Sequence, residues 1–150
     1  MARSLSPDEL ATYRALIAAG GLIERAVAAQ LAEHGLTALQ FSLLATLSGA
    51  PGPMRMRDLA DAVVHSRSGL TYQVSGLERR GLVARTASAA DERGVDVALT
   101  DAGRTVLAAA FPGHTDLLRT TLFDGVAPED LDATRRTLER AVGRVRAAGR

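Results

Sequence analysis

The sequence has no cysteine, no lysine and no tryptophan among its 150 residues. Without cysteine the protein has no disulfide, no thiolate metal ligand and no thiol-based redox sensor. Aromatic residues make up only 3% of the chain although apolar residues make up 47%, so the core must consist mainly of Ala, Leu and Val. Such a core suits packed helices better than a β-sandwich, and we expect a mainly α protein.

Signals for export and membrane insertion are also missing. The amino terminus, MARSLSPDEL, has no apolar signal region. The longest apolar stretch, 15–32, is interrupted by Glu24 and Arg25, which disfavours a membrane span. We therefore expect a cytoplasmic protein with no membrane partner.

No motif of a catalytic or metal site is found in the sequence. It lacks a GxSxG elbow, an HExxH pair, a P-loop and a dinucleotide-binding fingerprint. Its three histidines are scattered and, without cysteine, they disfavour a metal or nucleophilic site. We expect a protein that is not an enzyme and that needs neither a metal nor a cofactor.

The net charge of +1 does not by itself indicate a nucleic-acid partner. All 18 basic residues, however, are arginine. A guanidinium group binds phosphate and guanine edges in a planar, bidentate way that an ammonium group cannot. The distribution of these arginines is therefore more informative than their sum.

Helical periodicity is the clearest pattern in the first half of the chain. The stretch Ser6–Glu9 (SPDE) has the form of a capping box, and apolar residues then recur at helical spacing as far as Leu31. Thr37 is the expected N-cap of the next helix, and Gly81 ends the last of four. The expected helices are 7–34, 37–49, 54–64 and 66–80.

Alternating apolar and polar residues open the second half of the chain. The segments 82–86 and 95–100 are expected to be half-buried strands that a polar loop joins into a hairpin. A helix is expected over 101–123, bent or broken near Pro112, which cannot continue the hydrogen-bond ladder. A last helix begins at Pro128, and the residues expected to point inward from it are Leu131, Leu138, Val142 and Val145.

This layout predicts one domain over 1–150, with a central lobe at 36–102 between flanking helices at 7–34 and 103–148. The flanking helices carry more apolar residues than the lobe can cover. A two-fold dimer in which they interleave would bury the surplus, whereas a monomeric bundle is the alternative. The Gly20–Gly21 pair allows close helix packing or a bend, or leaves room for a ligand or a dimer partner.

The helix expected over 66–80 has two unlike faces. Leu70, Val74 and Leu77 fall on the side that packs on the lobe. Hydroxyls, one aromatic ring and two guanidinium groups fall on the other side and its flank, at Arg67, Ser68, Thr71, Tyr72, Ser75 and Arg79. They suit DNA bases and phosphates, although any solvated helix face is polar. Exposed Ser, Thr and Gly are poor helix formers, so their clustering favours a binding role, and the short preceding helix completes a helix-turn-helix.

The tip of the expected hairpin carries a second candidate contact. Arg93 extends from the loop, Asp91 is placed to orient its guanidinium, and Gly94 allows the turn. An arginine on such a tip suits the narrow minor groove of DNA, where the potential is most negative. A solvated surface loop is the alternative interpretation.

The order of these motifs resembles the MarR family of winged-helix transcriptional regulators over nearly the whole chain. The resemblance is carried by LTALQFSLLATL, MRDLADAV, SRSGLTYQVSGLERRGLVAR and DERGVDVALTDAG. The last of these, Asp-x-Arg-Gly followed by alternating residues and Leu-Thr-x-x-Gly, is the most specific. The resemblance implies a mainly α (α+β) fold. This fold is a winged helix-turn-helix with a small β-hairpin wing and dimerisation helices at both ends of the chain.

The resemblance further implies a homodimer that binds double-stranded DNA at a palindromic operator, usually as a repressor. It also implies that a small aromatic or anionic ligand often releases this dimer from the DNA. The DNA-binding residues carried over by position are Ser66, Arg67, Ser68, Thr71, Tyr72, Ser75 and Arg79 on the helix, with Asp91 and Arg93 on the wing. Tyr72 stands where many members have Arg, and Gly69 where Thr is common, so base preference does not transfer. A winged-helix module that binds a protein partner instead of DNA is the alternative.

An effector pocket in this family lies between the dimerisation helices and the DNA-binding lobe. The residues that the resemblance suggests for its lining are Tyr13, His34, Phe41, His65 and His114. Each of them has an alternative interpretation as a packing or surface residue. Because aromatic residues are few, an aromatic effector would lie mostly against aliphatic walls.

Overall fold

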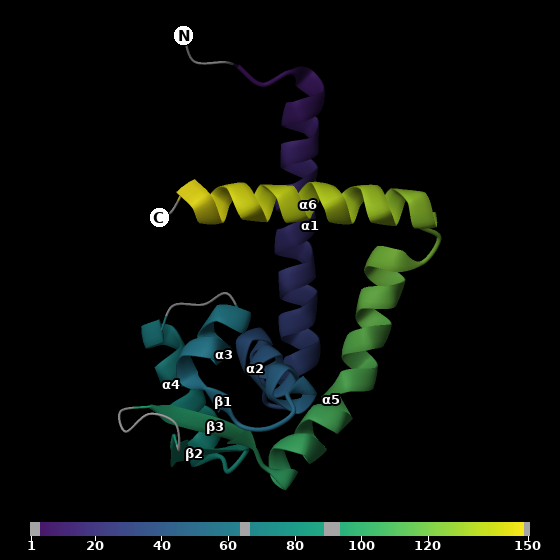
Figure 1. Cartoon of the computed structure of the whole chain (residues 1–150). Coiled ribbons are helices and arrows are strands. Elements are labelled where there is room, and N and C mark those ends of the chain that lie inside the picture. The colour runs from purple at the N-terminus through teal and green to yellow at the C-terminus, as the bar shows by residue number, and fades with distance from the viewer. Residues whose placement is uncertain (1–3, 64–66, 89–93, 149–150) are drawn as a thin grey trace. The chain divides into compact units, whose positions relative to one another are not determined.

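The computed structural model describes residues 4–63, 67–88 and 94–148, without the side chains of Arg67 and Ser68. The chain forms two compact units, Met1–Thr115 and Asp116–Arg150. Helices dominate and the strands form one small antiparallel sheet, so the expected mainly α, winged-helix class is confirmed (Figure 1). In chain order the elements are α1 (Pro7–Ala32), α2 (Ala38–Gly49), β1 (Met54–Arg55), α3 (Met56–Ala62), α4 (Arg67–Arg79), β2 (Val83–Ala87), β3 (Val95–Leu99), α5 (Asp101–Leu118), η1 (Arg119–Phe123) and α6 (Pro128–Ala148).

Local sequence signals fix the ends of α1 and α2. At the start of α1, the Ser6 amide donates to Oε2 of Glu9 over 2.7 Å, and the Glu9 amide donates to Oγ of Ser6 over 3.2 Å. Thr37 and Gln40 form the same capping box at the start of α2. The helix α1 ends two residues before the expected boundary, and Gly35 follows at a φ of +66°, which glycine adopts without strain.

The sheet has the strand order β1–β3–β2. Strands β2 and β3 form the expected antiparallel hairpin. A third strand joins it, because β1 pairs Met54 with Val97. The Ser88 amide donates to the carbonyl oxygen of Gly94 over 2.9 Å, so the two strands stay together beyond their ladder and hold the base of the wing.

The hydrophobic core lies in the first unit, among α2, α3, α4, the sheet and the last turns of α1. Its largest fully buried side chains are Leu31, Leu43, Leu44, Leu59, Leu70, Val74, Leu77 and Val97. This core is aliphatic, as the composition predicts. Each such side chain contributes about 1.5–3 kcal/mol of stability relative to an exposed one.

The first turn of α5 lies directly against the sheet. Thr100 caps this helix, because its hydroxyl accepts from the Gly103 amide over 3.0 Å and donates to the Gly81 carbonyl over 2.6 Å. No side chain fits at Gly103, where a Cβ would lie 2.1 Å from the carbonyl oxygen of Leu82. The Leu-Thr-x-x-Gly pattern therefore anchors α5 to the turn between α4 and β2.

The helix expected to be bent or broken near Pro112 is not broken there, because α5 continues as an α-helix through this residue to Leu118. A proline inside a helix removes one hydrogen bond, at a cost of roughly 3 kcal/mol. Contacts with α1 offset this cost, since Ala110 is fully buried and its carbonyl accepts from Nε2 of Gln30 over 3.3 Å. The irregular backbone comes later, in the π-helical turn η1.

Most of α1 is uncovered. Val27 and Leu31 are its buried residues, whereas its exposed large apolar side chains are Leu10, Tyr13, Leu16, Ile17 and Leu22. By length and composition alone α1 could cross a membrane. Glu24 and Arg25 oppose this, since a charge at the centre of a bilayer is costly. Among the described residues of its own unit, nothing lies within 4 Å of a Cβ built at Gly20. Another protein surface suits this face better than lipid.

The second unit contains η1 and α6, separated by Gly125 at a φ of +79°. The apolar stripe of α6 that was expected to point inward is exposed, because this unit supplies no surface to cover it; its members are Leu131, Leu138, Val142 and Val145. Val145 is 73% exposed. A groove of about 780 Å³ runs along the stripe and is also lined by Phe123. The stripe is therefore an unpartnered face of the chain.

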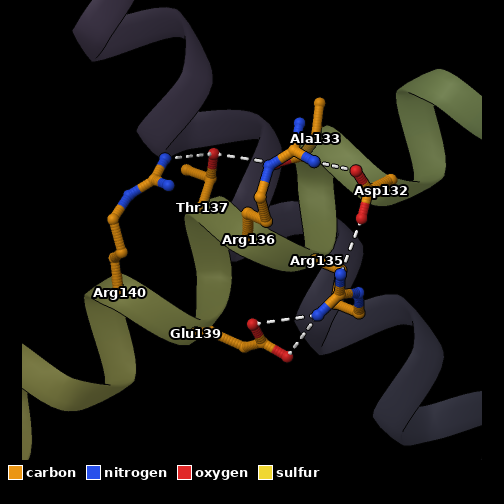
Figure 2. A network of polar contacts seen from close by, with 7 residues as sticks. All are labelled: Asp132, Ala133, Arg135, Arg136, Thr137, Glu139 and Arg140. Carbon is orange, nitrogen blue, oxygen red and sulfur yellow. Dashed lines mark hydrogen bonds and ion pairs between the residues drawn. The ribbon is translucent and has the colours of Figure 1, made fainter.

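Charged side chains along α6 pair with one another, as Figure 2 shows. Nη2 of Arg135 lies 2.6 Å from Oδ1 of Asp132, and Nη1 of Arg135 lies 3.0 Å from Oε1 of Glu139. Arg136 contacts the other oxygen of Asp132. Pairs of this spacing stabilise a helix by about 0.2–0.5 kcal/mol each. They leave the apolar stripe as the part of α6 that needs a partner.

Candidate nucleic-acid interface

The two faces of α4 are divided as its sequence predicts. Leu70, Val74 and Leu77 are buried in the lobe. On the other side Tyr72 is 70% exposed, although its ring is the largest side chain of the helix. Thr71 and Arg79 are also exposed and Ser75 is half-buried. An aromatic ring held in solvent beside hydroxyl and guanidinium groups is suited to bind bases and phosphates.

Several of the residues expected at this interface cannot be placed. Ser66, Asp91 and Arg93 lie outside the described residues, as do the side chains of Arg67 and Ser68. Their DNA contacts stay predictions from the sequence.

Two hydrogen bonds tie α4 and the residue that follows it to the first turn of α2 and to the connection before α2. Nε2 of Gln40 donates to Oε1 of Gln73 over 3.1 Å. Nη1 of Arg80 donates to the carbonyl oxygen of Gly35 over 2.7 Å. Because these bonds lie near both the middle and the end of α4, they fix how the helix is turned and which side chains it presents.

An ion pair joins α4 to the wing. Nε and Nη2 of Arg85 on β2 donate to Oε2 of Glu78, at 2.8 and 2.5 Å. This hydrogen bond lowers the pKa of Glu78 and raises that of Arg85. No sequence motif marks either residue, and the alternation of β2 places Arg85 on the same face as the buried Val83. The pair links β2 of the wing to the last turn of α4.

A cavity of about 380 Å³ lies behind this interface, lined by residues of α1, α2, α3 and α5. Phe41 and His114, two of the expected lining residues, border it, with ring centroids 4.4 Å apart. Tyr13 and His34 are not among its lining, and His65 lies outside the described residues. Ala62 and Val63 border the cavity at the end of α3, close in sequence to the start of α4.

The polar chemistry of the cavity centres on His114. Its Nδ1 is buried without a hydrogen-bond partner among the described residues. Burial lowers the pKa of this imidazole, so it is neutral in a folded protein near pH 7. Within the described part of the chain, no three His, Asp or Glu side chains are grouped to hold a metal ion. A neutral imidazole in an apolar cavity favours a hydrogen bond to an organic ligand.

Comparisons with known proteins agree with this geometry. A family model described as "MarR family" matches residues 34–94. AbsC, a MarR family transcriptional regulator from Streptomyces coelicolor, superposes with a TM-score of 0.92 at 31% identity, over 97% of this chain and 99% of that one. Sco3205, a MarR family regulator from the same organism whose structure was solved in complex with DNA, gives 0.91 at 32% identity, over 95% and 90%.

Curated sequences agree over a shorter span. YkoM of Bacillus subtilis (strain 168), named as an uncharacterized HTH-type transcriptional regulator, is 30% identical over 100 residues, which are 67% of this chain and 64% of that protein. The chain spans less than two thirds of the length of the curated relatives that it matches, between 45% and 64%. The shared part contains the helix-turn-helix.

Proposed function

Because the chain belongs to the MarR family of transcriptional regulators, we propose that it is a homodimeric, sequence-specific DNA-binding regulator. In this proposal α4 enters the major groove and the wing follows the adjacent minor groove. The observation that carries it is the outer face of α4, where Tyr72 is 70% exposed on a helix whose other face is fully buried. The DNA complex of Sco3205 supports the same use of the fold.

The proposed dimer forms through the uncovered faces of α1 and α6. A two-fold axis pairs each apolar stripe with a complementary copy, so that both are removed from water. The two α4 helices then read inverted half-sites about one helical turn, roughly 34 Å, apart. A dimer bound at such a palindromic operator within a promoter represses transcription by excluding polymerase. As a DNA-bound regulator, the protein acts in the cytoplasm.

Replacing Tyr72 with alanine is expected to change the sequence preference more than the general affinity for DNA. The exposed ring contacts base edges in the proposed complex, whereas phosphate contacts come from other residues. Fluorescence anisotropy compares wild type and Tyr72→Ala on a duplex selected from the source genome and on a random duplex. Affinity for the selected duplex should fall about 10-fold, corresponding to about 1.4 kcal/mol, with little change on the random one.

The variant Tyr72→Phe distinguishes the contribution of the ring from that of its hydroxyl, because it keeps the ring and removes the hydroxyl. It should keep the preference if apolar contact with bases dominates, and lose it if the hydroxyl donates or accepts a hydrogen bond. An equal loss on both duplexes for Tyr72→Ala contradicts base reading by this residue.

A protein partner in place of DNA is the second function that the fold allows. The salt dependence of duplex binding distinguishes the two functions, because binding to DNA releases counterions and weakens steeply with ionic strength. The purified wild-type protein is therefore titrated with a random duplex between low and physiological salt. A linear decrease of log K with log salt supports the regulator. Absence of any salt-dependent duplex binding favours the protein-binding module.

The effector in this proposal is an uncharged aromatic compound with a hydroxyl group. The cavity is lined by aliphatic side chains, Phe41, two hydroxyls and His114, and none of its lining residues in the described part of the chain is charged. An anion there would lose its hydration without gaining a counter-charge, whereas a phenol donates to the unpartnered Nδ1 of His114. Ligand pressing on Ala62 and Val63 reaches the end of α3, next to the DNA-binding helix.

The variant His114→Leu is expected to lose this response while staying folded. Phenol should raise the melting temperature of the wild-type protein, and the variant should need about 10-fold more, corresponding to one lost hydrogen bond of about 1–1.5 kcal/mol. Benzoate is the charged control and should have no effect on either protein. Equal responses to benzoate and phenol, or an unchanged phenol response in His114→Leu, contradict the uncharged effector.

A further inference from the structure

A hollow between α4 and the wing gathers three arginines. Arg55 and Arg57 border it from the start of α3, Arg85 borders it from β2, and Thr71 and Val95 complete its walls from α4 and β3. Its volume is about 360 Å³. We call it the arginine notch.

The notch lies where a DNA backbone would pass in the proposed complex. In the proposed complex α4 occupies the major groove and the wing occupies the neighbouring minor groove. One sugar-phosphate backbone always separates two adjacent grooves of a duplex, so a backbone must pass between the two elements. The notch opens there, and Thr71 belongs both to its wall and to the outer flank of α4.

The carboxylates around the notch differ in what they neutralise. Glu78 holds Arg85 through two short hydrogen bonds, so this arginine acts mainly as a structural link. Asp96 is the sheet partner of Arg55 in register. Arg55 is half-buried whereas Arg57 is 62% exposed, which leaves Arg57 as the most available guanidinium of the notch.

The contact of Arg57 with its own neighbour is weak. Its Nε lies 3.3 Å from Oδ1 of Asp58, and the two side chains are 62% and 51% exposed. An exposed ion pair of this kind contributes little to stability, and this contact uses Nε alone. A phosphate, which accepts two parallel bonds from a guanidinium, competes well with it.

We propose that the arginine notch binds one phosphate of the DNA backbone, with Arg57 as the residue that grips it. This inference rests on the proposed function and adds to it a contact that carries no sequence information. It sets the register of the lobe on the duplex, so that α4 and the wing enter their grooves together. The short pattern Met-Arg-Met-Arg at 54–57 supplies the arginine to this position.

Arg57→Ala tests the notch on a random-sequence duplex, since phosphate contacts do not depend on sequence. The slope of log K against log salt should become shallower by about 0.9 for each lobe engaged, and affinity at 0.1 M salt should fall about 8-fold per lobe. Asp58→Asn, which releases Arg57 from its neighbour, should raise the affinity. Arg104→Ala is the matched control, because Arg104 also faces one acidic neighbour, at 3.9 Å, and is 59% exposed outside the notch.

The outcomes separate the two proposals. If the wild-type protein binds the duplex but Arg57→Ala and Arg104→Ala have equal slopes, the notch is wrong and the regulator stands. If the wild-type protein shows no salt-dependent binding, the regulator itself is wrong. Thermal melting checks that Arg57→Ala is as stable as the control, so that a loss of binding reports contact with the phosphate.

Discussion

Gly103→Ala should lower the free energy of unfolding by about 3 kcal/mol or more. The added Cβ would lie 2.1 Å from the carbonyl oxygen of Leu82 and 2.6 Å from a methyl of Leu99. A backbone oxygen cannot rotate away as a flexible side chain does, so the start of α5 must separate from the sheet. The Thr100 cap, which binds both Gly81 and Gly103, is strained by the same movement.

Thermal melting of Gly103→Ala measures this effect, with Gly49→Ala as the matched control. Gly49 ends α2 in the same unit, and nothing lies within 4 Å of a Cβ built there. The control should melt within a few degrees of wild type, whereas Gly103→Ala should melt about 10 °C lower. Equal melting temperatures would mean that α5 is not anchored to the sheet by this close approach.

The double variant Leu138→Asp, Val142→Asp should convert the proposed dimer to a monomer. Both side chains line the α6 groove and are exposed in the single chain, so the change costs an isolated chain little. In a two-fold interface each substitution occurs twice. The double variant would therefore bury four unpaired carboxylates. The dissociation constant of the dimer should rise at least 100-fold, and sedimentation equilibrium measures it.

Ala133→Asp is the control for added charge on α6. Ala133 does not line the groove and lies beside Asp132 in Figure 2. This control should stay dimeric and keep its affinity for DNA, whereas the double variant should bind selected DNA far more weakly because each lobe then binds alone. A double variant that sediments as the wild type does would remove the apolar stripe from the dimer interface.

The parts of the fold that the sequence predicts well are those governed by neighbouring residues. Capping boxes at Ser6 and Thr37 form as expected, because the bonded groups are three residues apart. The division of α4 into buried Leu70, Val74 and Leu77 and an exposed Tyr72 follows from helical periodicity alone. These local rules are sufficient to present a candidate DNA-binding face.

The parts that the sequence does not predict depend on contacts between elements. Pro112 stays within α5, where the nearby carbonyl of Ala110 accepts from Gln30 of α1, and a local rule for proline cannot include such a contact between elements. The Glu78–Arg85 pair crosses a turn, so no spacing along one helix reveals it. The stripe of α6 was expected to be buried, but periodicity shows only that a face is apolar and not which molecule covers it. The arginine notch likewise exists only once α3, α4 and the wing come together.

Selection of bound duplexes from a random DNA pool tests the central claim most directly. The wild-type protein should enrich an inverted repeat whose half-sites are centred about 10 base pairs apart. Tyr72→Ala should change which bases are selected within each half-site. Enrichment of no motif, or of a motif that Tyr72→Ala leaves unchanged at every position, would contradict the assignment of α4 as the element that reads DNA.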